Sequence, residues 1–186
     1  HEELTRLIGE GRHTRRDHMY GGDDPARKDE PMLPTSVMSE AESRSKMLFE
    51  DGMEAWWRGD RVRAVAQWRA ALRKWPGHVD AMQHLGLAAF ERGRLAEAAR
   101  HFQAALELGQ HTLEFDEEAP ERARWCVLEN RPYLRALANL GLTRARQKRH
   151  AEALVIYERL VELNPDDNQG IRYLIGEQHH RAGRLD

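Results

Sequence analysis

Apolar residues in the middle of the chain recur at spacings of three and four residues, in two blocks separated by Gly93. This spacing places the apolar side chains of each block on one face of an α-helix. Gly93 takes a positive φ at low cost, so it favours a turn between the blocks. The pattern over 79–110 therefore predicts an antiparallel pair of helices. Its apolar members are Met82, Leu85, Ala89 and Phe90 in the first helix, and Leu95, Ala98, Ala99, Phe102, Ala105 and Leu106 in the second.

The same pair of blocks recurs along the chain. Gly52 matches Gly86 at a distance of 34 residues. Gly141 matches Gly86 at a distance of 55 residues, which exceeds one period by 21 and predicts an insertion over about 110–130. Gly176 marks a fourth copy that the chain does not complete. The predicted repeats are about 45–78, 79–110, 134–167 and, incomplete, 169–186.

A period of about 34 residues, with glycine inside the first helix and small Ala98 on the second, resembles the tetratricopeptide repeat family. The resemblance covers about 45–186 apart from the insertion, within a domain over 39–186. It implies an all-α fold, a right-handed α-solenoid of helix-turn-helix hairpins. The third and fourth repeats are also similar to bacterial members of the suppression-of-tumorigenicity type. The chain departs from the family pattern at Asp51, Lys148 and Gln110, where leucine, glycine and proline are usual.

Two polar stretches predict the ends of helices. Residues 1–38 form a polar extension, with helical spacing only in a short stretch around Leu4. Ser39 follows this extension and precedes two glutamates, which predicts that it caps the first helix. The stretch 164–168, Asn-Pro-Asp-Asp-Asn, predicts a turn in which an Asp or Asn oxygen caps the next helix.

The insertion begins with acidic residues and continues with arginines interleaved with apolar residues. Because Gln110 replaces the usual proline, we expect the preceding helix to continue past its usual end. Trp125, Val127 and Leu128 predict an amphipathic helix that is bent or begins near Pro132. Two interpretations stay open: a solvated charge pattern, or a functional protrusion at the edge of a groove. The acidic residues are Glu114, Asp116, Glu117, Glu118 and Glu121, and the arginines are Arg122, Arg124, Arg131 and Arg135.

Composition narrows the functional classes. A formal net charge of −2 over 186 residues gives no electrostatic reason to expect a nucleic-acid partner. No apolar run reaches the roughly 18 residues of a membrane span. The single Cys126 excludes an internal disulfide and fits a reducing, cytoplasmic location. The histidines and Cys126 show no spacing typical of metal ligation or nucleophilic catalysis, and glycine-rich phosphate loops are absent. We therefore expect no metal, no cofactor and no enzymatic activity.

In the tetratricopeptide architecture, the first helices of the repeats form most of a concave face. The resemblance therefore implies a peptide-binding groove on this face. Large apolar side chains in the first repeat are suited to anchor a peptide, although the segment before Ser45 is an alternative cover for them. The groove residues implied by register are Phe49, Met53, Trp56, Trp57, Gln83, Leu87, Phe90, Arg135, Leu142 and Tyr173.

Chaperone-type members of the family grip a C-terminal carboxylate with a lysine, two asparagines, a second lysine and a further basic residue. The matching positions here hold Phe49, Met53, His84, Arg135 and Asn139, so only Arg135 fits. We therefore expect a ligand that is at least partly apolar, with Arg135 available for an acidic group.

Together these features predict a non-catalytic adaptor or scaffold that binds a peptide or helical segment in the concave groove. One alternative is self-association through the incomplete C-terminal repeat, where Tyr173 and Ile175 lack a second helix to cover them. Another alternative is the recognition part of a larger enzyme.

Overall fold

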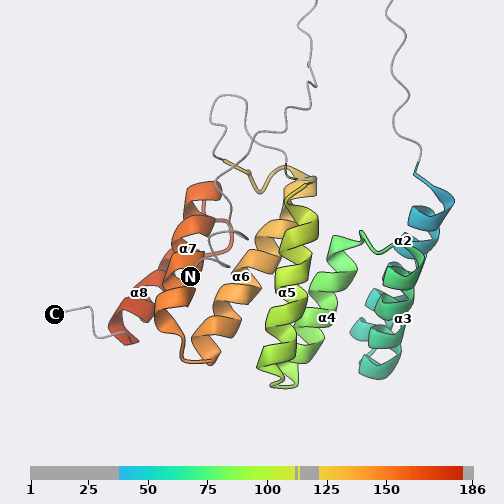
Figure 1. The fold of residues 1–186 in the computed structure, drawn as a ribbon, viewed down its shortest axis with the longest axis horizontal. Coiled ribbons are helices and arrows are strands. Elements are labelled where there is room, and N and C mark those ends of the chain that lie inside the picture. The colour runs from blue at the N-terminus through green and yellow to red at the C-terminus, as the bar shows by residue number, and fades with distance from the viewer. Residues whose placement is uncertain (1–37, 112, 114–121, 182–186) are drawn as a thin grey trace, which may run out of the picture.

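Helices account for most of the chain that the computed structural model describes, which is residues 38–111, 113 and 122–181 (Figure 1). No strand occurs in these ranges, so the predicted all-α fold is confirmed. The short helix expected around Leu4 lies outside the described residues. The elements are α2 (Glu40–Trp57), α3 (Arg61–Lys74), α4 (Val79–Glu91), α5 (Leu95–Gly109), η1 (Leu128–Asn130), α6 (Arg131–Arg146), α7 (His150–Leu163) and α8 (Ile171–Arg181).

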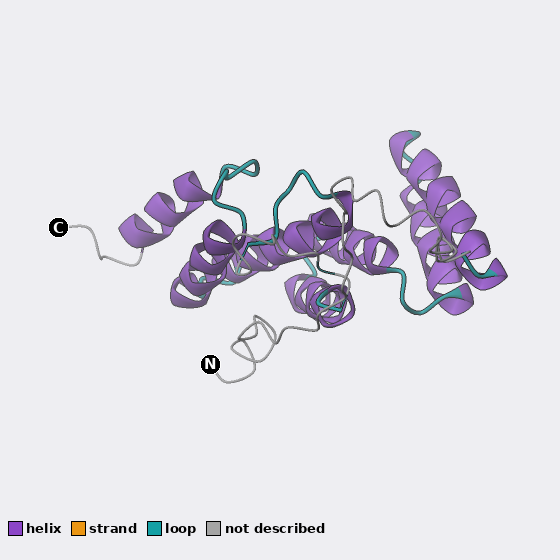
Figure 2. Cartoon of the chain, turned by 90° about the horizontal axis from the view of Figure 1, so that it is seen from above, coloured by secondary structure: helices purple, strands orange, loops and turns teal. Residues whose placement is uncertain are grey.

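Consecutive helices pair as hairpins, and the hairpins stack side by side as an α-solenoid. α2 packs against α3, α4 against α5 and α6 against α7, while α8 packs against α7. Neighbouring hairpins join through α3 with α4 and through α5 with α6. Seen from above, the α2–α3 hairpin stands at one end of the row and α8 at the other (Figure 2).

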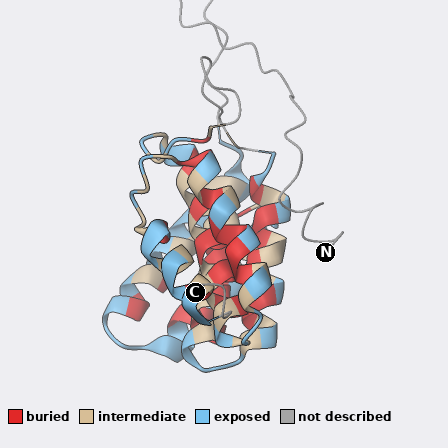
Figure 3. Ribbon diagram, turned by 90° about the vertical axis from the view of Figure 1, so that its left-hand side faces the viewer, coloured by how far each residue is buried: buried red, intermediate tan, exposed pale blue. Residues whose placement is uncertain are grey.

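The junctions between hairpins are unequal. α4 packs against α6, whereas α2 and α4 do not pack closely against each other. The core follows this division: one buried cluster around Trp68 joins α2, α3 and part of α4, and a second around Phe102 and Tyr157 extends from α4 to α8. Buried residues lie in the interior between the helices, and exposed residues cover the outside (Figure 3).

Side-chain caps fix the ends of two helices as predicted. Ser39 caps α2 in a reciprocal pair with Glu42, whose carboxylate accepts from the Ser39 backbone N–H at 2.7 Å. Asp167 caps α8: its two carboxylate oxygens accept from the backbone N–H groups of Ile171 and Arg172, at 2.6 and 3.1 Å. Each cap satisfies N–H groups that have no partner within the helix.

The insertion corrects two expectations. α5 ends at Gly109, so this helix does not continue past its usual end. Residues 122–127 are not helical, so Trp125 and Val127 lie outside the expected amphipathic helix. The expected start of a helix near Pro132 is confirmed, since α6 begins at Arg131 with Pro132 in its first turn. Tertiary hydrogen bonds hold the segment instead: the Ala123 N–H donates to the Leu163 carbonyl at 2.8 Å, and the Trp125 N–H to Asn164 Oδ1 at 3.2 Å. The acidic residues of the insertion lie outside the described residues.

Candidate functional site

The predicted groove residues lie on the first helices of the hairpins, α2, α4, α6 and α8, but they differ widely in exposure. Trp57 at the end of α2 is 79% exposed, and Tyr173 on α8 is 87% exposed. Four others are partly buried and present part of their apolar surface: Met53, Leu87, Phe90 and Leu142. α4 packs beside α6. Leu87 packs against the cluster around Trp68, and Phe90 against the cluster around Phe102. The repeat register assigns Leu87 and Phe90 of α4 and Leu142 of α6 to the same predicted concave face, and these three partly exposed residues are called the apolar row.

Two predicted groove residues, Trp56 and Gln83, belong to the interior. Trp56 is 8% exposed, with its ring centre 5.2 Å from that of Trp68 and the Arg61 guanidinium stacked 3.6 Å from its ring centre. Gln83 is 3% exposed. Both side chains are covered by neighbours, so neither offers surface to a ligand in this structure.

Phe49 packs at the junction of the first two hairpins. Its ring centre lies 4.9 Å from that of His78 and 5.1 Å from that of His84, the latter in an edge-to-face arrangement. His84 also contacts Trp68, with ring centres 5.2 Å apart. Phe49 therefore bridges α2 to α4, where the two helices otherwise do not pack closely.

Histidine protonation would disturb this junction. His78 Nδ1 accepts from the Ala81 N–H at 3.4 Å, at the start of α4, and His84 Nδ1 contacts the Asp80 carbonyl at 2.8 Å. Burial lowers the pKa of both His78 and His84 below the ordinary value of 6.5, although the Asp80 carboxylate opposes the shift. Both rings are therefore neutral at pH 7 and pack as aromatic groups.

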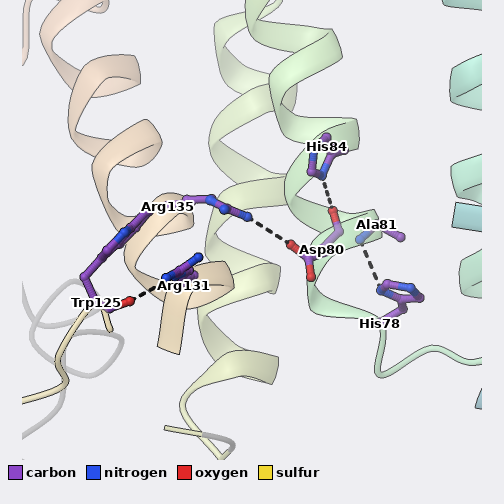
Figure 4. Close-up of polar contacts among 7 residues, drawn as sticks. All are labelled: His78, Asp80, Ala81, His84, Trp125, Arg131 and Arg135. Atoms are coloured by element: carbon purple, nitrogen blue, oxygen red, sulfur yellow. Dashed lines mark hydrogen bonds and ion pairs between the residues drawn. The ribbon is translucent and has the colours of Figure 1, made fainter. Parts of the chain in front are cut away.

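Arg135 connects the first turns of α4 and α6 at one edge of the apolar row. Its guanidinium lies 3.8 Å from the Asp80 carboxylate and 5.4 Å from the centre of the Trp125 ring. Trp125 and its neighbour Arg131 stand beside it (Figure 4). Trp125 comes from the insertion, so the insertion reaches the edge of the candidate groove.

The opposite edge of the row is closed by another arginine. The Arg146 guanidinium lies 4.6 Å from the centre of the Phe90 ring, and its Nη1 donates to the Phe90 carbonyl at 3.3 Å. This contact ties the end of α4 to the end of α6. The apolar row is thus bracketed by arginines on both edges.

The predicted groove set did not include Trp125, Arg131 and His84. The signal for Trp125 and Arg131 was the alternation of arginines with apolar residues in the insertion, which predicted an amphipathic helix that is bent or begins near Pro132. The alternation arises instead because Trp125 packs under the arginines of α6. The exposed Tyr173 does not by itself indicate a second copy of the chain, so self-association stays a prediction.

Two further searches of the described residues concern metal sites and membrane-spanning helices. No three His, Cys, Asp or Glu side chains within 38–111, 113 and 122–181 gather in a way that could hold a metal ion. In the same ranges, every helix is too short or too polar to cross a bilayer.

Comparison with known proteins identifies the repeats. Family models of the tetratricopeptide repeat match residues 49–111 and 134–167, and together these matches cover more than half of the chain. Among curated proteins the sequence has no significant match.

Several solved structures share the fold. The first tetratricopeptide domain of Spaghetti (RPAP3), bound to an HSP90 peptide, is 19% identical with a TM-score of 0.60, covering 76% of this chain and 98% of that one. The N-terminal domain of stress-induced protein-1 from C. elegans is 15% identical with a TM-score of 0.59, covering 76% and 99%. A tetratricopeptide repeat protein from Parabacteroides merdae is 22% identical with a TM-score of 0.58, covering 76% and 48%. The matched models and the stacked hairpins agree: the chain belongs to the tetratricopeptide repeat family.

Proposed function

We propose that this protein is an adaptor that binds an extended or helical segment of a partner protein across α4 and α6. The observation that carries the proposal is that Leu87, Phe90 and Leu142, the apolar row, are partly exposed on two helices that pack side by side, α4 and α6. Apolar side chains flanked by polar groups are the usual composition of a protein-binding surface. Arginines at both edges of the row supply these polar groups.

Exposed aromatic residues extend the surface beyond the row. Trp57 and Tyr173 are largely exposed on the first and last hairpins, and aromatic side chains contribute much of the binding energy at protein interfaces. Phe49 and Met53 are less available, since Phe49 packs between two histidines. We therefore place the main contacts on α4 and α6 and treat Trp57 as an additional anchor.

The segment bound by this protein should differ from the ligand of one structural neighbour, the RPAP3 domain, which holds an HSP90 peptide. In this chain the positions of the carboxylate-gripping set hold Phe49, Met53, His84, Arg135 and Asn139, which supply one permanent cation. The bound segment is therefore apolar at its centre, and a free C-terminal carboxylate is not its main anchor.

A charge placed in the row tests the proposal. Random peptides would be displayed as loops, with both peptide ends fused to a carrier protein so that no free C-terminal carboxylate is present. Peptides that bind the immobilised repeat protein would then be selected. Selected peptides should bind the Leu142→Glu variant at least about tenfold more weakly, because the new carboxylate must be desolvated against apolar surface. Val62→Glu on α3 is the control, since it introduces the same carboxylate at an apolar residue that is 77% exposed on the second helix of its hairpin.

Helical content measured by circular dichroism must remain that of the parent in both variants. Equal weakening by Val62→Glu would show that the effect is not specific to the row. Peptides that bind Leu142→Glu as tightly as the parent, or the selection of no peptide at all, would contradict the proposed function.

A further inference from the structure

Two arginines on adjacent turns of α6 approach the same indole. The guanidinium carbons of Arg131 and Arg135 each lie 5.4 Å from the centre of the Trp125 ring, within range of a cation–π interaction. Figure 4 shows the three side chains together at the start of α6, with Arg135 extended toward Asp80 on α4. The ring therefore holds two positive charges near each other at the edge of the apolar row.

Among the described residues, one carboxylate forms an ion pair with these arginines. Asp80 pairs with Arg135, and the 3.8 Å between the nitrogen and the oxygen is close to the limit for an ion pair. The Arg131 Nε donates to the Trp125 carbonyl at 2.9 Å, and no carboxylate among the described residues forms an ion pair with Arg131. Within the described residues, two arginines thus share one paired carboxylate at this edge, and the Arg135 side chain remains 42% exposed.

The insertion fixes Trp125 in this position. Hydrogen bonds from Ala123 to Leu163 and from Trp125 to Asn164 attach the segment to the end of α7. Asn130 Nδ2 donates to the Arg124 carbonyl at 3.2 Å and closes the segment onto the start of α6. These contacts fix the ring before any ligand binds, and the ring in turn positions the two arginines that contact it. Binding therefore orders the arginine side chains at a smaller cost in conformational entropy.

The basic edge runs beside the apolar row and not at its end. Asp80 and Arg135 lie in the first turns of α4 and α6, and Leu87 and Leu142 follow each of them seven residues later. Two helical turns correspond to roughly 10 Å along the helix axis. A segment that lies across Leu87 and Leu142 would therefore pass alongside the arginines. Side chains from the middle of that segment could then reach the guanidinium groups.

We infer that the edge formed by Trp125, Arg131 and Arg135 recognises an internal Asp or Glu side chain of the bound segment, next to its apolar anchor. This inference rests on the proposed function of the apolar row. A carboxylate can accept two parallel N–H bonds from one guanidinium, and Trp125 keeps both guanidinium planes in place. Trp125 acts as a positioning residue that comes from the insertion.

The same selection of peptides with both ends fused provides the test. Peptides selected on the parent protein should contain Asp or Glu at a fixed number of residues from a large apolar residue. Selection on the Arg131→Gln, Arg135→Gln double variant should keep the apolar residue and lose the acidic preference. Replacing the acidic residue of a selected peptide by Gln should weaken binding to the parent about tenfold, and much less to the double variant. This difference should shrink as salt concentration rises.

Matched controls separate the possible failures. Arg100→Gln on α5 removes an exposed arginine from a second helix and should leave the acidic preference intact. Trp125→Leu keeps apolar packing but removes the ring face, and should weaken the preference while both arginines remain. Apolar peptides selected without acidic residues, or an acidic preference that survives the double variant, would overturn the inference while leaving the proposed function in place. The selection of no peptide would overturn both.

Discussion

Phe102 of α5 lies directly across Gly86 of α4: a Cβ built on Gly86 would stand 2.6 Å from the nearest carbon of the Phe102 ring. The same relationship joins the other two hairpins, where Trp68 covers Gly52 and Tyr157 covers Gly141. An aromatic side chain of each second helix thus occupies the space that a side chain on the first helix would need. The helices can approach closely only because glycine lacks a Cβ.

Gly86→Ala should lower the free energy of unfolding by about 1–2 kcal/mol. Alanine favours the helix by about 0.5–1 kcal/mol, but overpacking against a fully buried ring costs about 1–3 kcal/mol. Urea denaturation followed by circular dichroism would measure the change.

Gly176→Ala is the matched control for this substitution. Gly176 holds the corresponding place on α8, and no described atom lies within 4 Å of a Cβ built there. The free energy of unfolding should therefore stay constant or rise by up to about 1 kcal/mol. A destabilisation as large as that of Gly86→Ala would contradict the role given to the aromatic rings.

Stability should fall as the pH drops below about 6.5, because burial lowers the pKa of His78 and His84 in the folded protein. Between the folded and unfolded pKa values, the unfolded chain binds more protons, so acid favours unfolding. The contribution of the two neutral histidines to the free energy of unfolding is complete above pH 6.5 and is lost as the pH falls below that value. Protonation must also place charge among Phe49, Trp68 and the cations Lys46 and Arg135.

The His78→Asn, His84→Gln double variant should reduce this dependence on pH. Asn at position 78 can still cap α4, so the comparison isolates the charge. Unfolding free energies at pH 7.5 and 5.5 would give the slope for each protein. Burial also lowers the pKa of His101, which the variant retains. The unfolding free energy of the variant should therefore still fall with pH, but less steeply than that of the parent. An identical slope in parent and variant would count against the histidines as its source.

Lys148→Gly should raise the free energy of unfolding by about 0.5–1 kcal/mol. Lys148 has φ of 62° in the turn before α7, where the turns of the first two hairpins use Gly59 and Gly93 at 85° and 73°. A positive φ strains residues that carry a Cβ, and glycine relieves this strain. Part of the gain is offset because glycine raises the conformational entropy of the unfolded chain. Lys148→Ala removes the lysine side chain but keeps the strain. Equal stabilisation by Ala and Gly would show that the charge, and not the backbone, limits stability.

Asn164→Ala should release the insertion from α7. Asn164 is 2% exposed, and its Oδ1 is the acceptor for the Trp125 N–H. Loss of this acceptor should cost about 1–3 kcal/mol and accelerate hydrogen exchange at the Trp125 amide. Asn168→Ala, an exposed change in the same connection, should alter neither quantity. Unchanged exchange at Trp125 in Asn164→Ala would show that other contacts hold the segment.

Much of the fold could be read from spacing. The recurrence of Gly52, Gly86 and Gly141 predicted the hairpins and the family, and Ser39 and the 164–168 stretch predicted caps that the structure contains. These features depend on residues within one or two helical turns, or within one hairpin. Their physical cause is therefore present in the local order of the chain.

The surface of the candidate groove could not be read in the same way. Register placed Trp56, Gln83 and Leu87 on one functional face, yet Trp56 and Gln83 are buried and Leu87 is only partly covered. Burial at these positions depends on contacts that the register does not contain. Trp68 and Arg61 of α3 cover Trp56, for example.

The sequence by itself therefore determined the helices of the repeats, their pairing and their order in the stack, but not the conformation of the insertion. Tertiary structure alone decided that Phe49 fills the junction beside His84 and that Trp125 leaves the helical path to lie against Arg135. The reason is the range of the interactions. Helical periodicity and caps act over a few residues, whereas these contacts join segments far apart along the chain and form only when the hairpins have packed.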